Sequence, residues 1–206
     1  MAACPPSSDV IYSRSMRITG GTHRSRALHA PRGDRTRPTS DRVREALFAI
    51  LGARRSFEGL RVLDLYAGTG ALALEALSRG AAHATLVESA KGARDCILAN
   101  VEALNLQTRV RIVGCPVERA TRAIAEQAPF DLVLADPPYA LVPTGEVARA
   151  LGMLAAPASG LFADTATLVL EHASADHPPE LAAFALTDSR RYGDTAVSLY
   201  ALADAS

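Results

Sequence analysis

The sequence has few of the residues that make covalent cross-links, and it has no long apolar run. Its 206 residues include three cysteines, Cys4, Cys96 and Cys115. They lie far apart without C-x-x-C spacing, which argues against a disulfide framework or a zinc site, and we expect no metal. No apolar run reaches about 18 residues, which argues against a transmembrane helix. The first residues show no secretory signal, so we expect a reducing, cytoplasmic location without membrane attachment.

The sequence also lacks net charge, because 22 Lys and Arg balance 22 Asp and Glu. This zero conceals an uneven distribution. Between Arg14 and Arg44 nine arginines occur with two acids, a net charge of +7, and the rest of the chain carries the opposite charge. A basic arm on an acidic body indicates a polyanionic partner. A solvated basic segment would give the same count, so charge alone leaves both interpretations open.

The composition that is present, 49% hydrophobic and 21% charged, is typical of one globular domain with a real core. From residue 59 onward strands and helices alternate, which predicts a mostly parallel, doubly wound α/β sheet. The last two strands, separated by Arg-Arg-Tyr-Gly-Asp, suit a hairpin instead of another crossover. We expect strands at 61–66, 84–88, 109–113, 130–135, 167–171, 184–188 and 195–202, and helices at 71–79, 91–104, 117–127 and 146–154.

The N-terminal part has a different pattern. Residues 1–15 have little periodicity and predict a disordered tail. Residues 17–28 predict a short strand, a Gly-Gly turn and a second short strand, which would put Arg24 and Arg26 on one face. A helix is expected from Thr39 or Ser40 to about residue 51, because apolar residues there recur at helical spacing.

The segment Asp64-Leu65-Tyr66-Ala67-Gly68-Thr69-Gly70 joins the first strand of the alternating region to its helix. Glycine lets the backbone approach a ligand closely and adopt positive φ. Glu88 ends the next strand, where an acid can accept hydrogen bonds from ribose hydroxyls. The segment therefore predicts a nucleoside cofactor. With Ala73 it also fits the loose dinucleotide pattern G-x-G-x-x-A, and a tight turn beside a surface acid remains the structural alternative.

The segment Asp136-Pro137-Pro138-Tyr139 directly follows the expected strand 130–135. Two prolines fix the backbone and remove two N–H donors, which leaves carbonyl groups held in place as acceptors. Aspartate adds an anionic acceptor, and tyrosine adds a flat surface for stacking. These groups suit the exocyclic amine of a nucleobase, although a rigid loop leaving the sheet is the structural alternative.

Together the two segments resemble class I S-adenosylmethionine-dependent amino-methyltransferases. R-I-T-G-G-x5-A-L at 17–28, R-P-T-S-D-R-V-R-E-A-L-F at 37–48 and R-Y-G-D-T at 191–195 are similar to the bacterial 16S rRNA (guanine(966)-N(2))-methyltransferase family, and the resemblance covers residues 16–202. It implies a Rossmann-like seven-stranded sheet with helices on both faces and the last strand antiparallel. Beyond the tail at 1–15, which lies outside the resemblance, we expect a short basic N-terminal extension at 16–58 and a methyltransferase domain at 59–203.

The resemblance implies site residues by position. Asp64 and the 67–70 turn would hold the methionine end of the cofactor, Glu88 its ribose, and residues 115–117 would flank its adenine. Many relatives have an amide or an acid where this chain has Cys115, so backbone contacts would replace that side chain. The implied cofactor-binding residues are Thr39, Asp64, Tyr66, Ala67, Gly68, Thr69, Gly70, Glu88, Ser89, Cys115, Pro116 and Val117. Asp136, Pro137, Pro138 and Tyr139 would hold the target guanine as catalytic residues.

The implied partner is 16S rRNA or an assembling small ribosomal particle, bound by a monomer. Its phosphates would contact Arg17, Arg24, Arg26, Arg37, Arg42 and Arg191, with Arg32, Arg35 and Arg44 expected to join them. The implied reaction transfers a methyl group from S-adenosylmethionine to the N2 amine of guanine.

Three alternatives remain open from the sequence. A DNA amino-methyltransferase shares the pocket chemistry, although the chain lacks a sizeable target-recognition domain. An NAD-dependent oxidoreductase explains Gly68, Gly70 and Glu88 but not the Asp-Pro-Pro-Tyr segment. A non-catalytic RNA-binding module explains only the basic arm.

Overall fold

The structure is a computed structural model that describes residues 12–31, 39–156 and 159–203, except for the side chains of residues 12–15, 31, 39 and 40. The strands are β1 (Tyr12–Arg17), β2 (Ala27–Pro31), β3 (Arg61–Leu65), β4 (His83–Val87), β5 (Val110–Val113), β6 (Phe130–Ala135), β7 (Phe162–Ala173), β8 (Phe184–Tyr192) and β9 (Thr195–Leu202). The helices are α1 (Thr39–Arg54), α2 (Ala71–Ser78), α3 (Lys91–Ala103), α4 (Thr121–Ile124) and α5 (Glu146–Leu154).

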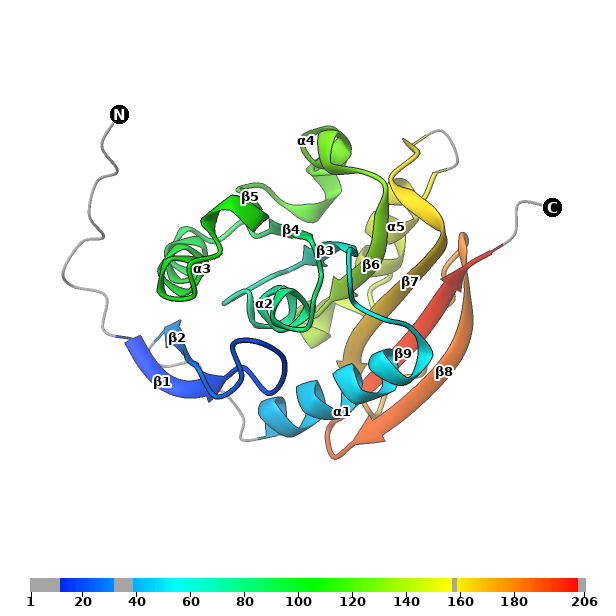
Figure 1. The fold of residues 1–206 in the computed structure, drawn as a ribbon. Coiled ribbons are helices and arrows are strands. Elements are labelled where there is room, and N and C mark those ends of the chain that lie inside the picture. The colour runs from blue at the N-terminus through cyan, green and yellow to red at the C-terminus, as the bar shows by residue number, and fades with distance from the viewer. Residues whose placement is uncertain (1–11, 32–38, 157–158, 204–206) are drawn as a thin grey trace.

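A seven-stranded sheet forms the centre of the molecule, in the order β5-β4-β3-β6-β7-β9-β8. Strands β3 to β7 pair in parallel, whereas β9 is antiparallel to both β7 and β8. Figure 1 shows this twisted sheet with α1 and α2 across one face. The predicted Rossmann-like sheet with its last strand antiparallel is confirmed, and so is the terminal hairpin.

Both faces of the sheet are apolar, because the central strands alternate between two cores. In β3, Val62 packs with α1, α2 and α3, whereas its neighbour Leu63 packs with α4 and α5. In β6, Leu132 and Val133 divide in the same way. A strand buried on both sides reads as a continuous apolar run, which is why these segments were recognisable from sequence. The helices therefore cover both faces, as expected.

The N-terminal extension shares the first of these cores. Ile18 and Leu28 are fully buried, and they pack in the same cluster as Val43 and Leu47 of α1. Figure 1 shows β1, β2 and α1 on the side of the sheet that carries α2 and α3, with β2 next to α3. The extension is consequently a structural part of the fold as well as a basic segment.

The start of this extension differs from the sequence expectation. Strand β1 begins at Tyr12, inside the expected tail, and pairs antiparallel with β2 across an intervening segment, 18–26. Gly20 and Gly21 lie in this connecting segment, where the backbone N–H of Arg24 donates to the carbonyl oxygen of Gly21 at 3.2 Å. Gly21 has a φ of 76°, and a Cβ there would lie 1.9 Å from the carbonyl oxygen of Ser78. The glycines thus let residues 18–26 follow the end of α2 closely. Arg24 and Arg26 lie outside the strands, so they do not share a strand face.

Other elements differ from their expected bounds, and β8 runs to Tyr192 instead of residue 188, into the segment expected to join the last two strands. The expected helix 117–127 is broken into short turns around α4, although Val117, Ala120 and Ile124 still bury one side. Strand β7 is longer than the expected 167–171, because its first residues extend beside the start of β6. In the part of the chain that the structure describes, no helix has both the length and the apolar character needed to cross a membrane.

Candidate active-site cleft

A cleft of about 750 Å³ opens at the carboxyl ends of the parallel strands, where Rossmann-like folds bind ligands. Its volume is in the range of small-molecule and cofactor sites. It brings both predicted segments together. We call the part formed by Asp64, residues 66–69, Glu88, Ser89 and residues 115–117 the cofactor side. We call the part formed by residues 136–139, Glu171 and Thr195 the base side.

The loop after β3 gives the cofactor side its shape. Tyr66, Gly68 and Gly70 all have positive φ values, of 59°, 55° and 78°. Tyr66 adopts this conformation without being glycine, which is a source of local strain. A Cβ on Gly70 would lie 2.9 Å from Cδ2 of Leu86, so the start of α2 packs closely against β4. Gly70 therefore supports the loop from behind, whereas Tyr66, Ala67, Gly68 and Thr69 line the cleft.

Glu88 holds this loop against the end of β4. Its Oε2 accepts a hydrogen bond from the backbone N–H of Gly68 at 2.9 Å, and its Oε1 accepts one from Ala90 at 2.7 Å. Each carboxylate oxygen can accept more than one hydrogen bond. The side chain also lines the cleft, so it can keep both backbone contacts while it accepts hydrogen bonds from the hydroxyl groups of a ligand.

Asp64 lies deeper, beneath the start of α2. It is 1% exposed, and its Oδ2 accepts the backbone N–H of Ala73 at 3.1 Å. Its Oδ1 is buried and has no hydrogen-bond partner among the described residues. Burial raises the pKa of this carboxyl well above its ordinary value, and the charges of Asp136 and Glu88 add to the effect. A buried acid with an unused oxygen in a cleft suits a positively charged ligand.

The remaining cofactor-side residues follow the ends of β4 and β5. Cys115, Pro116 and Val117 line the cleft with Ser89, and the Cys115 side chain is partly exposed. Burial raises the pKa of Tyr66 to about 12, so its hydroxyl stays protonated. Thr39 begins α1, but its side chain lies outside the described residues.

Residues of the N-terminal extension form the wall above the cofactor side. They were not among the cofactor-binding residues expected from the sequence. Met16, Val43, Arg44 and Leu47 line the cleft. The sulfur of Met16 accepts a hydrogen bond from the Thr69 hydroxyl at 3.7 Å. The apolar spacing of α1 indicated that Val43 and Leu47 face inward, but it did not indicate that they face the cleft.

The base side carries the Asp-Pro-Pro-Tyr segment, which leads from β6 into a short helical turn. Asp136, Pro137, Pro138 and Tyr139 all line the cleft. The Tyr139 hydroxyl donates to Oε1 of Glu171 at 2.8 Å and lies 2.7 Å from Oγ1 of Thr195. Sequence reasoning missed both partners. Glu171 lies in an ordinary apolar strand, and Thr195 was noticed only as the last residue of the Arg-Tyr-Gly-Asp-Thr segment.

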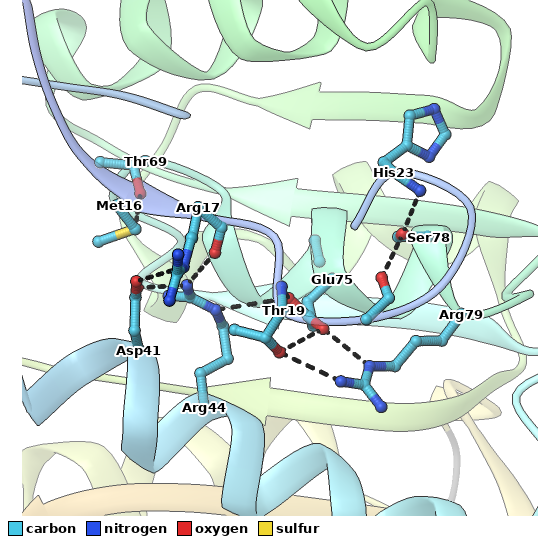
Figure 2. A network of polar contacts seen from close by, with 12 residues as sticks. Met16, Arg17, Thr19, His23, Asp41, Arg44, Thr69, Glu75, Ser78 and Arg79 are labelled. Atoms are coloured by element: carbon cyan, nitrogen blue, oxygen red, sulfur yellow. Dashed lines mark hydrogen bonds and ion pairs between the residues drawn. The ribbon is translucent and has the colours of Figure 1, made fainter. Parts of the chain in front are cut away.

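A buried network joins the extension to α2, as Figure 2 shows. Glu75, fully buried in α2, accepts hydrogen bonds from the backbone and the side chain of Thr19, both at 2.7 Å. It also pairs with Arg79 at 2.8 Å and with Arg44 at 3.6 Å. Arg44 is 4% exposed and contacts Asp41 as well, at 2.7 Å. The expectation that Arg44 faces RNA is therefore wrong, because its charge is used inside the fold.

The other predicted RNA-binding arginines have different positions. Arg17, Arg24, Arg26, Arg42 and Arg191 are exposed. Arg17 lies 3.7 Å from Asp41, and Arg26 donates to the carbonyl oxygen of Ala103 at 2.9 Å. Arg37, Arg32 and Arg35 fall outside the described residues. Among the residues that are described, no group of His, Cys, Asp and Glu is arranged to hold a metal ion.

Comparison with protein families gives a match over nearly the whole chain. The family described as "Conserved hypothetical protein 95" matches residues 16–201. The chain belongs to this family. The matched range includes the N-terminal extension and both sides of the cleft, so the site described above lies entirely inside the conserved hypothetical protein 95 region.

Individual relatives of this family member are similar over long ranges. The Bacillus subtilis protein named "Putative rRNA methyltransferase YlbH" is 34% identical over 187 residues, which cover 90% of this chain and 98% of the relative. "Ribosomal RNA small subunit methyltransferase D" of Escherichia coli is 39% identical over 128 residues, 62% of each chain. The solved structure "Putative methyltransferase yhhF from Escherichia coli" has a TM-score of 0.75 at 34% identity, covering 91% of this chain and 97% of that one. This member of the family is a methyltransferase.

Proposed function

We propose that the protein transfers a methyl group from S-adenosylmethionine to the exocyclic N2 amine of a guanine in 16S rRNA, in the cytoplasm. One observation carries the proposal: Asp136-Pro137-Pro138-Tyr139 lines the same cleft as Asp64 and Glu88. A site for a nucleobase amine and a site for a nucleoside cofactor thus open on one space. Two relatives carry names that specify rRNA methylation, which supports the choice of RNA.

The cofactor side fits S-adenosylmethionine. The buried Oδ1 of Asp64 has no partner among the described residues, and a cationic ligand would compensate for its burial. Glu88 would accept hydrogen bonds from the ribose hydroxyls, and residues 115–117 would flank the adenine. When bound, S-adenosylmethionine supplies the methyl group on a positively charged sulfur.

The same geometry argues against a dinucleotide cofactor. A pyrophosphate binds at the N-terminus of a helix through free backbone N–H groups. Here the N–H of Gly68 donates to Glu88 and the N–H of Ala73 donates to Asp64. Two of the N–H groups near the start of α2 therefore already donate to carboxylates, and the charge of these carboxylates would repel an NAD pyrophosphate.

On the base side the role of the protein is to position the guanine amine. The guanine amine is a weak nucleophile, since its lone pair is delocalised into the ring. Asp136 and the Pro137 carbonyl would each accept one of its N–H groups, which draws the nitrogen toward tetrahedral geometry and orients its lone pair. Tyr139 would stack on the base and offset part of the cost of removing it from the RNA stack. Positioning of this kind can contribute roughly 7–11 kcal/mol.

The negative charge of the cleft favours entry of the RNA base over entry of the RNA phosphates. Asp64, Glu88, Glu118, Asp136 and Glu171 line it, and Arg44 is the one cation among the described lining residues. Phosphates would be repelled from this space, whereas an uncharged base can enter. The exposed arginines, Arg17, Arg24, Arg26, Arg42 and Arg191, are proposed to bind the phosphates outside the cleft.

The test is a methyl-transfer assay with radiolabelled S-adenosylmethionine on three substrates: small ribosomal particles, naked 16S rRNA and DNA. We expect label in the RNA-containing substrates and N2-methylguanosine after nuclease digestion. Label only in DNA, as an N-methylated adenine or cytosine, would instead support the DNA amino-methyltransferase. Calorimetry with S-adenosylmethionine and NAD tests the cofactor separately, and preferential binding of NAD would refute the proposal.

A further inference from the structure

Tyr139 is tied at its hydroxyl by two side chains that come from different strands. Glu171 lies near the end of β7, and Thr195 is the first residue of β9. Both line the cleft beside Tyr139, and Thr195 is buried, with 4% of its surface exposed. A buried tyrosine hydroxyl usually has a hydrogen-bond partner, and this one has two, at 2.8 and 2.7 Å.

The direction of these hydrogen bonds is set by chemistry. An ionised carboxylate only accepts, so the single hydroxyl hydrogen of Tyr139 goes to Glu171. Thr195 must then donate its own hydrogen to the Tyr139 oxygen. The result is a chain in one direction, from Thr195 through Tyr139 to Glu171, in which every hydroxyl hydrogen has an acceptor.

Burial and the neighbouring Glu171 charge raise the pKa of Tyr139 well above its ordinary value. The phenol therefore stays protonated and remains a donor throughout the neutral pH range. The chain is consequently a lasting tether, and it fixes the far end of the ring while residues 136–138 fix the near end through the backbone.

We propose that Glu171 and Thr195 are positioning residues that lock the plane of the Tyr139 ring, and so set where the target base stacks relative to Asp136. The inference rests on the proposed function for its consequence in catalysis. Its structural part, a ring held at both ends, concerns the protein alone. Neither residue touches the reacting atoms in this scheme; both act through Tyr139.

Four single variants separate tethering from general stability. Glu171→Ala removes the acceptor, and Thr195→Val removes the donor while keeping the side-chain shape. Glu171→Gln keeps an acceptor oxygen, and Thr195→Ser keeps a donor. We expect kcat for RNA methylation to fall by about 10- to 100-fold in the first two, because a small misplacement of reacting groups can cost that much. The conservative pair should recover most of the rate, and the Kd for S-adenosylmethionine should stay within about twofold in all four.

A double-mutant comparison tests whether the residues act through Tyr139. Tyr139→Phe removes only the hydroxyl, so Tyr139→Phe combined with Glu171→Ala should be no slower than either single variant. Rate reductions that multiply, or a parallel drop in cofactor affinity, would overturn the tether and indicate independent structural roles.

A measurement without RNA keeps this inference separate from the proposed function. The chain has five tyrosines, so ring resonances of 13C-labelled tyrosine can be resolved by NMR, with Tyr139→Phe identifying the relevant signals. Slow flipping of the Tyr139 ring in the wild type and fast flipping in Glu171→Ala support the tether. Equal flipping rates in both overturn it. If the ring is locked but no RNA is methylated, the proposed function fails and the tether stands.

Discussion

On the cofactor side of the cleft, acidic side chains are held by backbone N–H groups near them in sequence, whereas on the base side the tyrosine is held by side chains from distant strands. Gly68 and Ala73 donate to acids 20 and 9 residues away. Tyr139 bonds to partners 32 and 56 residues away. A site whose contacts lie close together in sequence can be recognised from a short motif. A site assembled across strands depends on the sheet order, and here that order places β9 beside β7.

The largest effect should come from the base side. Asp136→Ala removes the anionic acceptor for the amine, and we expect methylation to fall by more than about 1,000-fold, since positioning supplies much of the rate. Cofactor binding should be nearly unchanged, because Asp136 belongs to the other side of the cleft. Turnover close to that of the wild type, measured alongside calorimetry with S-adenosylmethionine, would remove Asp136 from the mechanism.

Loss of the buried carboxylate of Glu75 in α2 should destabilise the molecule as a whole. Glu75→Ala leaves Arg44 buried with one acid fewer and removes the acceptor for Thr19. Removing one partner of a buried pair costs roughly 3–5 kcal/mol, which urea unfolding would measure. Glu75→Gln is the matched control, because it keeps an acceptor for Thr19. If the alanine variant is as stable as the wild type, the network does not anchor the extension.

On the cofactor side, Asp64→Asn should separate binding from stability. The variant lacks the negative charge that suits the sulfonium cofactor, and we expect its Kd for S-adenosylmethionine to rise by about 10- to 100-fold, or roughly 1.4–2.8 kcal/mol. Without ligand, the same change removes the ionisable form of a buried carboxyl, so it should change how the stability of the protein depends on pH.

The pH dependence of the free energy of unfolding tests how burial affects the Asp64 carboxyl. Burial raises the folded-state pKa of Asp64 above the ordinary value of 3.8, so the folded state binds more protons than the unfolded state above that pH. The wild-type free energy of unfolding should therefore fall as pH rises from about 3.8 through the raised pKa. Asp64→Asn should lack this contribution in thermal melts from about pH 4 to 8. Identical pH profiles in the two proteins would show that Asp64 is not buried as a costly acid.

The smallest effect should come from outside the cleft. Arg42→Ala removes an exposed charge near the buried Arg44, and we expect RNA affinity to fall a few-fold while cofactor binding is unchanged. The slope of log affinity against log salt should shrink by roughly 0.7–0.9 for each phosphate that the variant no longer binds. Arg122→Ala on α4, an exposed arginine on the opposite face of the sheet, is the control. Equal salt slopes for both variants would argue against phosphate binding at Arg42.

Deleting the whole extension would not test RNA binding cleanly. Ile18 and Leu28 are fully buried, and Thr19 contacts Glu75, so removal of residues 1–36 would also open the core. Single substitutions of exposed arginines are the sharper test.

Much of the fold was predictable from the sequence. The central strands are apolar on both faces, and the bounds expected for β6, α5 and β9 match the structure. The glycine-rich loop and the Asp-Pro-Pro-Tyr segment were recognisable because their chemistry lies in consecutive residues. The strands of the hairpin β1–β2 were expected at the wrong residues, and the sequence did not indicate that Gly20 and Gly21 also pack closely against the end of α2.

By itself, the sequence determined the strand–helix order, the two motifs and the uneven charge, because each follows from residues close together in the chain. Only the tertiary structure decided which charges are internal. Arg44 and Arg42 are two residues apart in the same basic arm, yet one is buried against Glu75 and the other is exposed. Whether a charge can be buried depends on a partner supplied by another part of the chain, and the packing of the extension on α2 supplies it here.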